Sequence, residues 1–402
     1  MAMLGFTACD KDCDHDFIEH DFTKELVGTW TSFDGELAEA MIIKEDGSFT
    51  TTGVAKGGSL YEEKGTIKVV NNKVTLVFDG DKETFEGRLE LVAGKSMSLV
   101  MFDDNDVRLT YDYCTNDLSD EILGMWVCTQ LPIGKEGDML IHTFQEDGKL
   151  ILTGRIPETD DYVVAGESNY MVFGDLYISY GKEEEKALIF KFNVAPNASE
   201  LGDMMTVTGF MPTENGIVEE TSTWLRVKQH LELPGMKYDY IKTFVTNVKG
   251  LDKDIEFMGT TFNFAKMDGV KLDKMLKAVL FTVEFPDANT IRYSCKYNDF
   301  DMKLDAPIAV DGNKMTVKMS EKNPALKDVD LYTFQDQDNT QMHMYMHSTG
   351  FVNFFGNMQV TIMEQMNLLD TTDAAAVKAV FDSIDDAVET INVSFVMTRV
   401  AK

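Results

Sequence analysis

The sequence contains little cysteine and little histidine. Five cysteines and six histidines are scattered over 402 residues, and none of them forms a CxxC pair or a zinc-binding spacing. So few cysteines cannot build a disulfide framework, and we expect buried free thiols instead. The pattern therefore predicts neither a metal site nor a cofactor.

Long apolar runs and familiar catalytic motifs are also missing. No stretch of about 18 apolar residues occurs, which excludes a membrane-spanning helix. GxSxG, HExxH, P-loop and GxGxxG motifs are absent, so the sequence indicates a protein that is not an enzyme. Carboxylates are abundant, which leaves open a weaker hypothesis of a hydrolase with an unrecognised carboxylate pair.

Positive charge is scarce relative to negative charge. Lys and Arg number 37 against 68 Asp and Glu, giving a formal net charge of −31. A surface of this sign repels phosphate backbones and anionic lipids, so we expect no nucleic-acid partner. A hydrophobic share of 44% over this length indicates a folded chain of two to four domains.

The first nine residues, MAMLGFTAC, form a short apolar run that ends in small residues and a cysteine. This stretch resembles the end of a bacterial lipoprotein signal peptide whose charged start is missing. The resemblance implies that Cys9 carries acyl chains and anchors the protein to a membrane. The acidic stretch that follows matches no EF-hand loop and is expected to be a solvated tether, so residues 1–21 form the signal remnant and tether.

Two segments of the chain repeat the same landmarks. GTW at 28–30 and GMW at 124–126 each precede an apolar strand, a Glu-Asp-Gly turn and a second strand. Asp-Gly between alternating strands is a strong hairpin signal, because glycine accepts the positive φ of a tight turn. The turns at Asp46-Gly47 and Asp147-Gly148 are therefore expected at the same structural place.

A third, fainter copy follows. Its hairpin turn is expected at 286–289, and IAVDGNKMTVKM at 308–319 matches IKVVNNKVTLVF at 67–78. The segment FMGTTFNF keeps a glycine at 259 but has Thr261 where the tryptophan is expected. Each copy supplies eight or nine short strands, a number that closes a small antiparallel barrel.

Glycine-x-tryptophan before an antiparallel meander resembles the lipocalin and calycin group, and most closely the tandem lipocalin-like domains of Bacteroidetes lipoproteins. The resemblance implies that Gly28, Trp30, Gly124 and Trp126 close barrel ends. It implies further that an arginine on the last strand packs across each tryptophan. Arg226 and Arg399 match that place in the second and third copies, and Arg108 is an approximate match in the first.

We therefore predict a mainly β chain of three tandem antiparallel lipocalin-like barrels over residues 22–116, 117–229 and 230–402. The third copy is expected to add an amphipathic helix within 371–391, with Thr372 as N-cap and Val377, Val380, Phe381, Ile384 and Val388 on its apolar face. A short helix is also expected after Pro234-Gly235.

The stretch at 341–363 carries the most unusual local chemistry. Read as a strand, it places Met342, Met344 and Met346 on one face. The histidines at 343 and 347 would lie about 13 Å apart on the other face, too far to share one ion. The methionines are candidate lining residues for an apolar ligand, although general core filling is the simpler interpretation.

These observations support a membrane-anchored lipoprotein of the cell envelope that binds a small apolar ligand. We expect it in the outer membrane, facing the periplasm or the cell surface. The alternative is a structural or interaction module of a surface complex, with barrels filled by their own side chains.

Overall fold

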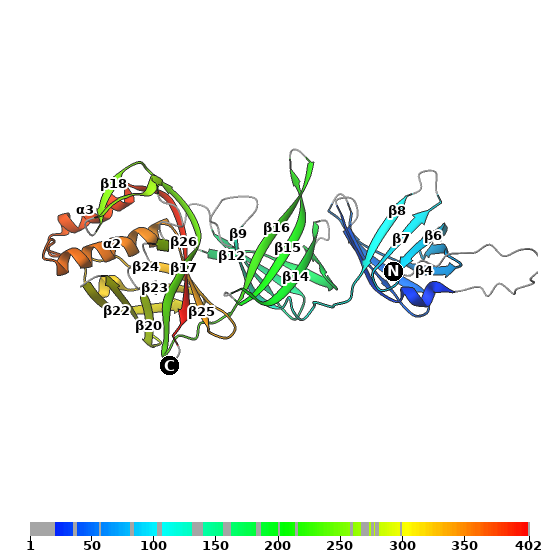
Figure 1. The fold of residues 1–402 in the computed structure, drawn as a ribbon, viewed down its shortest axis with the longest axis horizontal. Helices are drawn as coiled ribbons and strands as arrows, with labels where there is room; N and C mark the ends of the chain where they lie inside the picture. The colour runs from blue at the N-terminus through cyan, green and yellow to red at the C-terminus, as the bar shows by residue number, and fades with distance from the viewer. Residues whose placement is uncertain are drawn as a thin grey trace, which may run out of the picture. The chain divides into compact units, whose positions relative to one another are not determined.

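The computed structural model places most of the chain. The described residues are 21–34, 38–55, 58–80, 84–102, 107–130, 140–155, 162–181, 186–199, 202–213, 216–257, 260–266, 273–274, 277, 281–297 and 300–400. They form three closed barrels of eight antiparallel strands (Figure 1). The predicted fold class is confirmed. The first barrel forms one compact unit, and the second and third barrels together form another.

The first barrel is a simple meander in which each strand pairs with the next and β8 closes onto β1. A short 3-10 helix, η1 (Phe22–Leu26), precedes it. Its strands are β1 (Gly28–Phe33), β2 (Ala38–Ile43), β3 (Ser48–Val54), β4 (Leu60–Val70), β5 (Lys73–Phe78), β6 (Thr84–Val92), β7 (Ser96–Met101) and β8 (Arg108–Tyr113).

The second barrel repeats this meander, with its first strand closing between the second and the last. Its strands are β9 (Gly124–Gln130), β10 (Leu140–Phe144), β11 (Lys149–Arg155), β12 (Tyr162–Phe173), β13 (Leu176–Tyr180), β14 (Ala187–Ser199), β15 (Gly202–Thr213) and β16 (Gly216–Val227).

The Asp-Gly turns of these two barrels occupy the same place, as the repeat predicts. Gly47 has φ +76° and Gly148 has φ +77°, and each joins the second and third strands of its barrel. The Asp46 carboxylate accepts a hydrogen bond from the Ser48 amide at 2.9 Å, which fixes the turn. An L-residue rarely adopts this φ, so the glycine is a requirement of the hairpin.

The third barrel departs from the simple meander because a two-stranded sheet is inserted after its first strand. The barrel strands are β17 (Met236–Gly250), β20 (Thr282–Asp287), β21 (Thr290–Tyr297), β22 (Phe300–Asp311), β23 (Lys314–Val317), β24 (Val329–Gln335), β25 (Gln341–Met346) and β26 (Val388–Arg399). The inserted sheet is β18 (Asp254–Phe257) with β19 (Thr260–Asn263). The helix expected after Pro234-Gly235 is wrong, because β17 occupies that segment.

Two α-helices, α2 (Ser348–Gln365) and α3 (Ala374–Asp385), lie between β25 and β26. Helix α3 is the expected amphipathic helix, and Val377, Val380, Phe381 and Ile384 are buried. Its N-cap is Asp373 rather than Thr372, and Val388 already belongs to β26. Helix α2 was not expected. Neither of these helices has the combination of length and apolarity that a bilayer crossing requires.

Both faces of β25 are buried, which no isolated barrel strand requires. Its inward methionines belong to the core of the third barrel. Its outward Tyr345 packs with Tyr332 and Phe334 of β24 against residues of the second barrel, namely Val127, Ile141 and Val227. The second and third barrels therefore share an apolar contact surface.

Two short helices, η2 (Phe264–Lys266) and η3 (Met319–Glu321), complete the described elements.

Candidate functional site

A buried tryptophan lies near the start of the first strand in each of the first two barrels. Trp30 and Trp126 are fully buried. The indole Nε1 of Trp30 donates to the Leu26 carbonyl at 2.6 Å, and that of Trp126 donates to the Ile122 carbonyl at 2.7 Å. Each indole is thus fixed to the chain four residues before it. This gives the Trp a place at the barrel end and satisfies its only polar group.

The glycine two residues before each tryptophan has a backbone reason. Gly28 has φ +139° and Gly124 has φ +109°, which L side chains rarely adopt. In the first barrel, space adds to this requirement, because a Cβ on Gly28 would lie 2.6 Å from the Tyr113 ring. The Gly-x-Trp motif is therefore the backbone turn that brings the indole into the barrel end.

In the second barrel an arginine packs on the tryptophan. Arg226 pairs with Trp126 across β16 and β9, and its guanidinium carbon lies 4.7 Å from the centre of the ring. An ion pair with Asp203 at 3.5 Å holds the other side of the guanidinium. Such a contact is a cation–π interaction, strengthened here because the arginine is largely buried.

In the first barrel a tyrosine takes that place, so the match of Arg108 is wrong. Tyr113 pairs with Trp30 across β8 and β1, and the two rings meet edge to face at 4.9 Å. Arg108 instead forms an exposed ion pair with Glu90. The first barrel therefore uses an aromatic pair where the second uses a cation–π pair.

In the third barrel the tryptophan position is occupied by Tyr238, not Thr261. Tyr238 is fully buried and pairs with Arg399 across β17 and β26, as Trp126 pairs with Arg226. Its hydroxyl accepts a hydrogen bond from Gln335 at 2.8 Å. Thr261 lies in the inserted sheet. Gly235 has φ +75° but precedes the aromatic residue by three positions, and a search for Gly-x-Trp misses this spacing.

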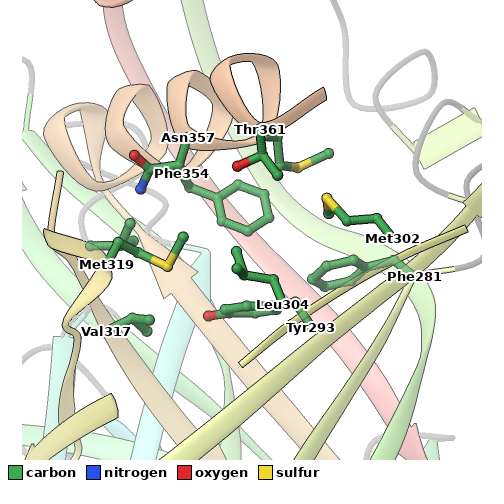
Figure 2. A pocket seen from close by; sticks show the side chains of 11 residues that line it. Phe281, Tyr293, Met302, Leu304, Val317, Met319, Phe354, Asn357 and Thr361 are labelled. Carbon is green, nitrogen blue, oxygen red and sulfur yellow. The ribbon is translucent and has the colours of Figure 1, made fainter. Parts of the chain in front are cut away.

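The third barrel contains an apolar pocket beneath α2 (Figure 2). About 20 Å³ of it admits the centre of a water molecule, which is room for about one small group. The lining comes from the four strands β21 to β24, from η3, from the residue before β20, and from α2. The residues are Phe281, Tyr293, Met302, Leu304, Val317, Met319, Val329, Phe354, Asn357, Met358 and Thr361.

Helix α2 forms the roof of this pocket. Figure 2 shows Phe354 and Thr361 extending from the helix toward the strands below. Asn357 fixes the helix, because its side chain accepts from the Lys327 amide at 2.9 Å and donates to the Lys327 carbonyl at 2.7 Å. Both bonds of one buried amide thus join the roof to the segment before β24.

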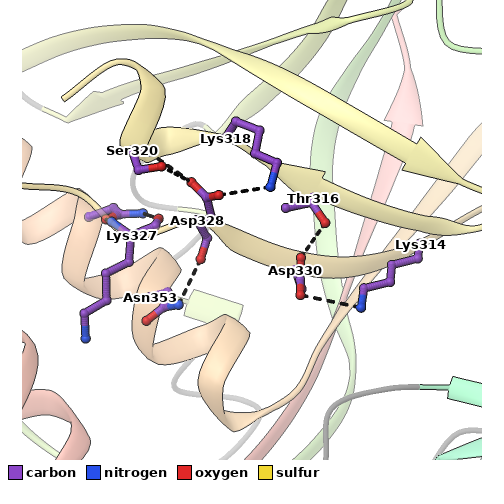
Figure 3. A network of polar contacts seen from close by, with 9 residues as sticks. Lys314, Thr316, Lys318, Ser320, Lys327, Asp328, Asp330 and Asn353 are labelled. Atoms are coloured by element: carbon purple, nitrogen blue, oxygen red, sulfur yellow. Dashed lines mark hydrogen bonds and ion pairs between the residues drawn. The ribbon is translucent and has the colours of Figure 1, made fainter. Parts of the chain in front are cut away.

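A second set of polar contacts fixes the N-terminal half of the roof (Figure 3). Asn353 of α2 donates to the Asp328 carbonyl at 2.9 Å. The Asp328 carboxylate accepts from the Ser320 hydroxyl at 2.7 Å and pairs with Lys318 at 3.1 Å. These contacts lower the pKa of Asp328, although its partial burial opposes them. The carboxylate thus remains charged at neutral pH. Asp328 links η3 to α2, because its carboxylate binds Ser320 and its carbonyl binds Asn353.

The three methionines singled out from the sequence lie in the same core but not in the lining. Met342, Met344 and Met346 are almost completely buried and belong to the apolar core of the third barrel. None of them is among the 11 lining residues. The methionines that do line the pocket are Met302, Met319 and Met358, which are separated in sequence and share no local pattern.

The interior of the second barrel is filled by aromatic side chains. The core there includes Trp126, Phe144, Tyr177, Phe192 and Trp224. His142 stacks on Trp224 with ring centres 4.1 Å apart. His142 as a residue is half-buried, and its Nδ1 is buried without a hydrogen-bond partner. Desolvation lowers the pKa of His142 to about 3, so the imidazole is neutral.

Other expectations concern residues beyond this site. Cys9 and the acidic tether lie outside the described residues. Over the described ranges, no group of three or more His, Cys, Asp or Glu side chains is arranged to hold a metal ion. Cys128 and Cys295 are buried thiols and Cys114 is half-buried.

Comparisons with known proteins assign no family to this chain. No family model matches the chain. No curated protein matches it either. Among solved structures, intact Ap-TbpB with its N and C lobes is 9% identical, with a TM-score of 0.22 and coverage of 90% of this chain. The chain spans about two thirds of that structure, 66%. The three barrels fit a calycin-like fold, and a likeness this weak carries no functional argument.

Proposed function

We propose that this chain is a non-enzymatic binding protein of the cell envelope whose third barrel receives a narrow apolar group. The observation that carries the proposal is the apolar pocket beneath α2. Small-molecule sites are concave, mostly apolar and provided with a few polar groups, and this pocket has that character. Tyr293, Asn357 and Thr361 are its polar residues.

The width of the pocket selects the class of ligand. A space for about one small group excludes a bulky ring system unless side chains move. Met302, Met319 and Met358 are unbranched and flexible, so they adjust to an entering chain at small cost. An unbranched hydrocarbon chain fits this combination of narrowness and adaptability.

Binding of propane, a short unbranched hydrocarbon, by the full chain tests this proposal. We expect saturable binding in calorimetry, and a loss of about tenfold or more in Met302→Phe, which fills the pocket. Met342→Leu is the matched control, because it alters a core methionine outside the lining. Equal affinity of Met302→Phe and the unaltered chain would reject the pocket as the site. Native mass spectrometry of protein from its host would identify a co-purifying ligand.

We also propose anchoring through acylated Cys9 in the outer membrane, on the strength of the residues at 1–9. Cys9→Ala is expected to move the protein from the membrane fraction to the soluble fraction. Continued membrane association of that variant would argue against this anchor. Cys114→Ala is a suitable control because it removes a thiol far along the chain from the signal-like segment.

A structural or interaction module is the second candidate. The observation that favours it is the filling of the second barrel by its own aromatic side chains. On this hypothesis the barrels present outer surfaces to a protein partner. The propane experiment separates the two candidates, since a purely structural module gives no saturable signal.

A further inference from the structure

A carboxylate is buried inside the first barrel. Glu39 of β2 is 6% exposed. Its two oxygens accept hydrogen bonds from the hydroxyls of Tyr61 on β4 and Tyr111 on β8. Three strands that are distant in sequence therefore direct polar side chains to one point within an otherwise apolar interior.

A glycine makes room for this arrangement. Gly53 of β3 pairs with Glu39 in the ladder. A Cβ at Gly53 would lie 2.5 Å from the Tyr61 hydroxyl oxygen and 2.7 Å from the Glu39 Cβ. Its φ is not in the left-handed region, so space rather than backbone conformation requires the glycine here.

A second polar group nearby has no partner. Thr51 is 3% exposed, and its hydroxyl oxygen is buried without a hydrogen bond. It pairs with Met41, which belongs to the barrel core, so it shares the inward face with Gly53 two residues on. A buried hydroxyl left unpaired is costly, which indicates a group that a ligand would satisfy.

The cluster lies away from the level of Trp30 in the barrel. Trp30 pairs with Met41 and Ser32 pairs with Glu39, so the carboxylate is two residues further from η1 than the indole level. Tyr61 is half-buried at the start of β4, on the same side. Glu39 and the half-buried Tyr61 therefore lie on the side of the barrel away from η1 and the tryptophan.

The charge at Glu39 is not compensated by the chain. Among the described residues, no Lys, Arg or His forms an ion pair with it, and the charge that acts on it is that of Glu63, also negative. Burial raises the pKa of Glu39, since an isolated charge is poorly solvated there. The two tyrosine hydroxyls occupy only part of its acceptor capacity.

A metal ion is a poor fit to this site. One carboxylate supplies too few ligands, and no metal-binding group of three side chains occurs where the structure describes the chain. An organic ammonium fits better. It donates up to three hydrogen bonds, which Glu39 and Thr51 accept.

We propose that the interior of the first barrel binds the primary ammonium group of a small amine through Glu39, with Thr51 as a second acceptor. This site lies in a different barrel from the apolar pocket. On this proposal the first barrel binds a cationic ligand and the third barrel binds an apolar one. The strongly acidic chain, with net charge −31, raises the local concentration of such cations.

The test is titration of the full chain with n-butylammonium, followed by calorimetry. We expect one saturable site, at least tenfold weaker binding of the neutral isostere 1-butanol, and at least a tenfold loss in Glu39→Gln. Glu86→Gln is the matched control, an exposed carboxylate of the same barrel paired with Lys73. It should change affinity less than twofold.

Thr51→Val is a second variant that tests the site even where Glu39→Gln misfolds. Valine keeps the shape of the threonine side chain and removes only its hydroxyl. We expect it to weaken n-butylammonium binding about threefold with the near-ultraviolet circular dichroism unchanged. Affinity should also fall as pH drops through the raised pKa of Glu39. Tyr61 and Tyr111 stay neutral throughout, since burial and Glu39 raise the pKa of both. Equal binding of 1-butanol and n-butylammonium, or no loss in Glu39→Gln, would overturn the proposal.

Discussion

In the second barrel, Arg226 covers one face of Trp126, with its guanidinium carbon 4.7 Å from the centre of the ring. The same ladder position holds Tyr113 against Trp30 in the first barrel and Arg399 opposite Tyr238 in the third. What repeats among the barrels is therefore a pair of facing residues on the first and last strands, and its chemistry differs in each copy.

Removing the cation from this pair should destabilise the second barrel. Arg226→Met keeps much of the side-chain bulk but loses the cation–π contact and the ion pair with Asp203. We expect the free energy of unfolding to fall by about 0.5–2 kcal/mol. Denaturant unfolding followed by tryptophan fluorescence measures it. Arg108→Met is the control, since its exposed ion pair with Glu90 should contribute under about 1 kcal/mol.

Much of the barrel architecture is readable from the sequence because its signals are local. Gly-x-Trp and Asp-Gly are short patterns with a backbone cause, and both mark the same places in the first two barrels. Tyr238 was missed because its glycine is three residues away rather than two, and because a tyrosine replaces the tryptophan.

The roof helix and the pocket were harder to predict, for different physical reasons. Phe351, Phe354, Phe355, Met358 and Ile362 of α2 are all buried and follow helical spacing, yet they continue directly from the strand pattern of β25. The pocket has no local signal at all. Its lining comes from separate elements that only the closure of the barrel brings together.

Acid should destabilise the second and third barrels through His142. Burial lowers its pKa to about 3 from 6.5, so the folded state resists a proton that the unfolded state accepts. The stabilising effect is present above pH 6.5 and is lost as pH falls toward 3, by at most about 1.4 kcal/mol per pH unit.

The His142 effect is isolated by comparison with His142→Phe, which retains an aromatic ring beside Trp224. The difference in unfolding free energy between the two proteins should grow as pH falls from 6.5. Parallel pH profiles for the two would contradict the prediction, because the many carboxylates titrate in both.

The roof helix requires a glycine where it crosses β24. A Cβ on Gly350 would lie 2.5 Å from the Asp330 carbonyl oxygen, a backbone atom that cannot rotate away. Gly350→Ala should therefore cost about 1–3 kcal/mol despite the better helix propensity of alanine. Gly181→Ala, where a Cβ meets open space, should leave stability nearly unchanged. Thermal unfolding of both variants is the measurement, and equal effects would contradict the close approach.

Asn357 should control how firmly the roof is held. Asn357→Ala removes both hydrogen bonds to the Lys327 backbone, at a cost of about 1–3 kcal/mol. Hydrogen exchange at the Lys327 amide should accelerate by more than the change in global stability alone produces, because the contact is local. Asn353→Ala is the control. It loses a single bond to the Asp328 carbonyl and should leave Lys327 protected. If Lys327 exchanges equally fast in both variants, the roof is held by its apolar face and not by Asn357.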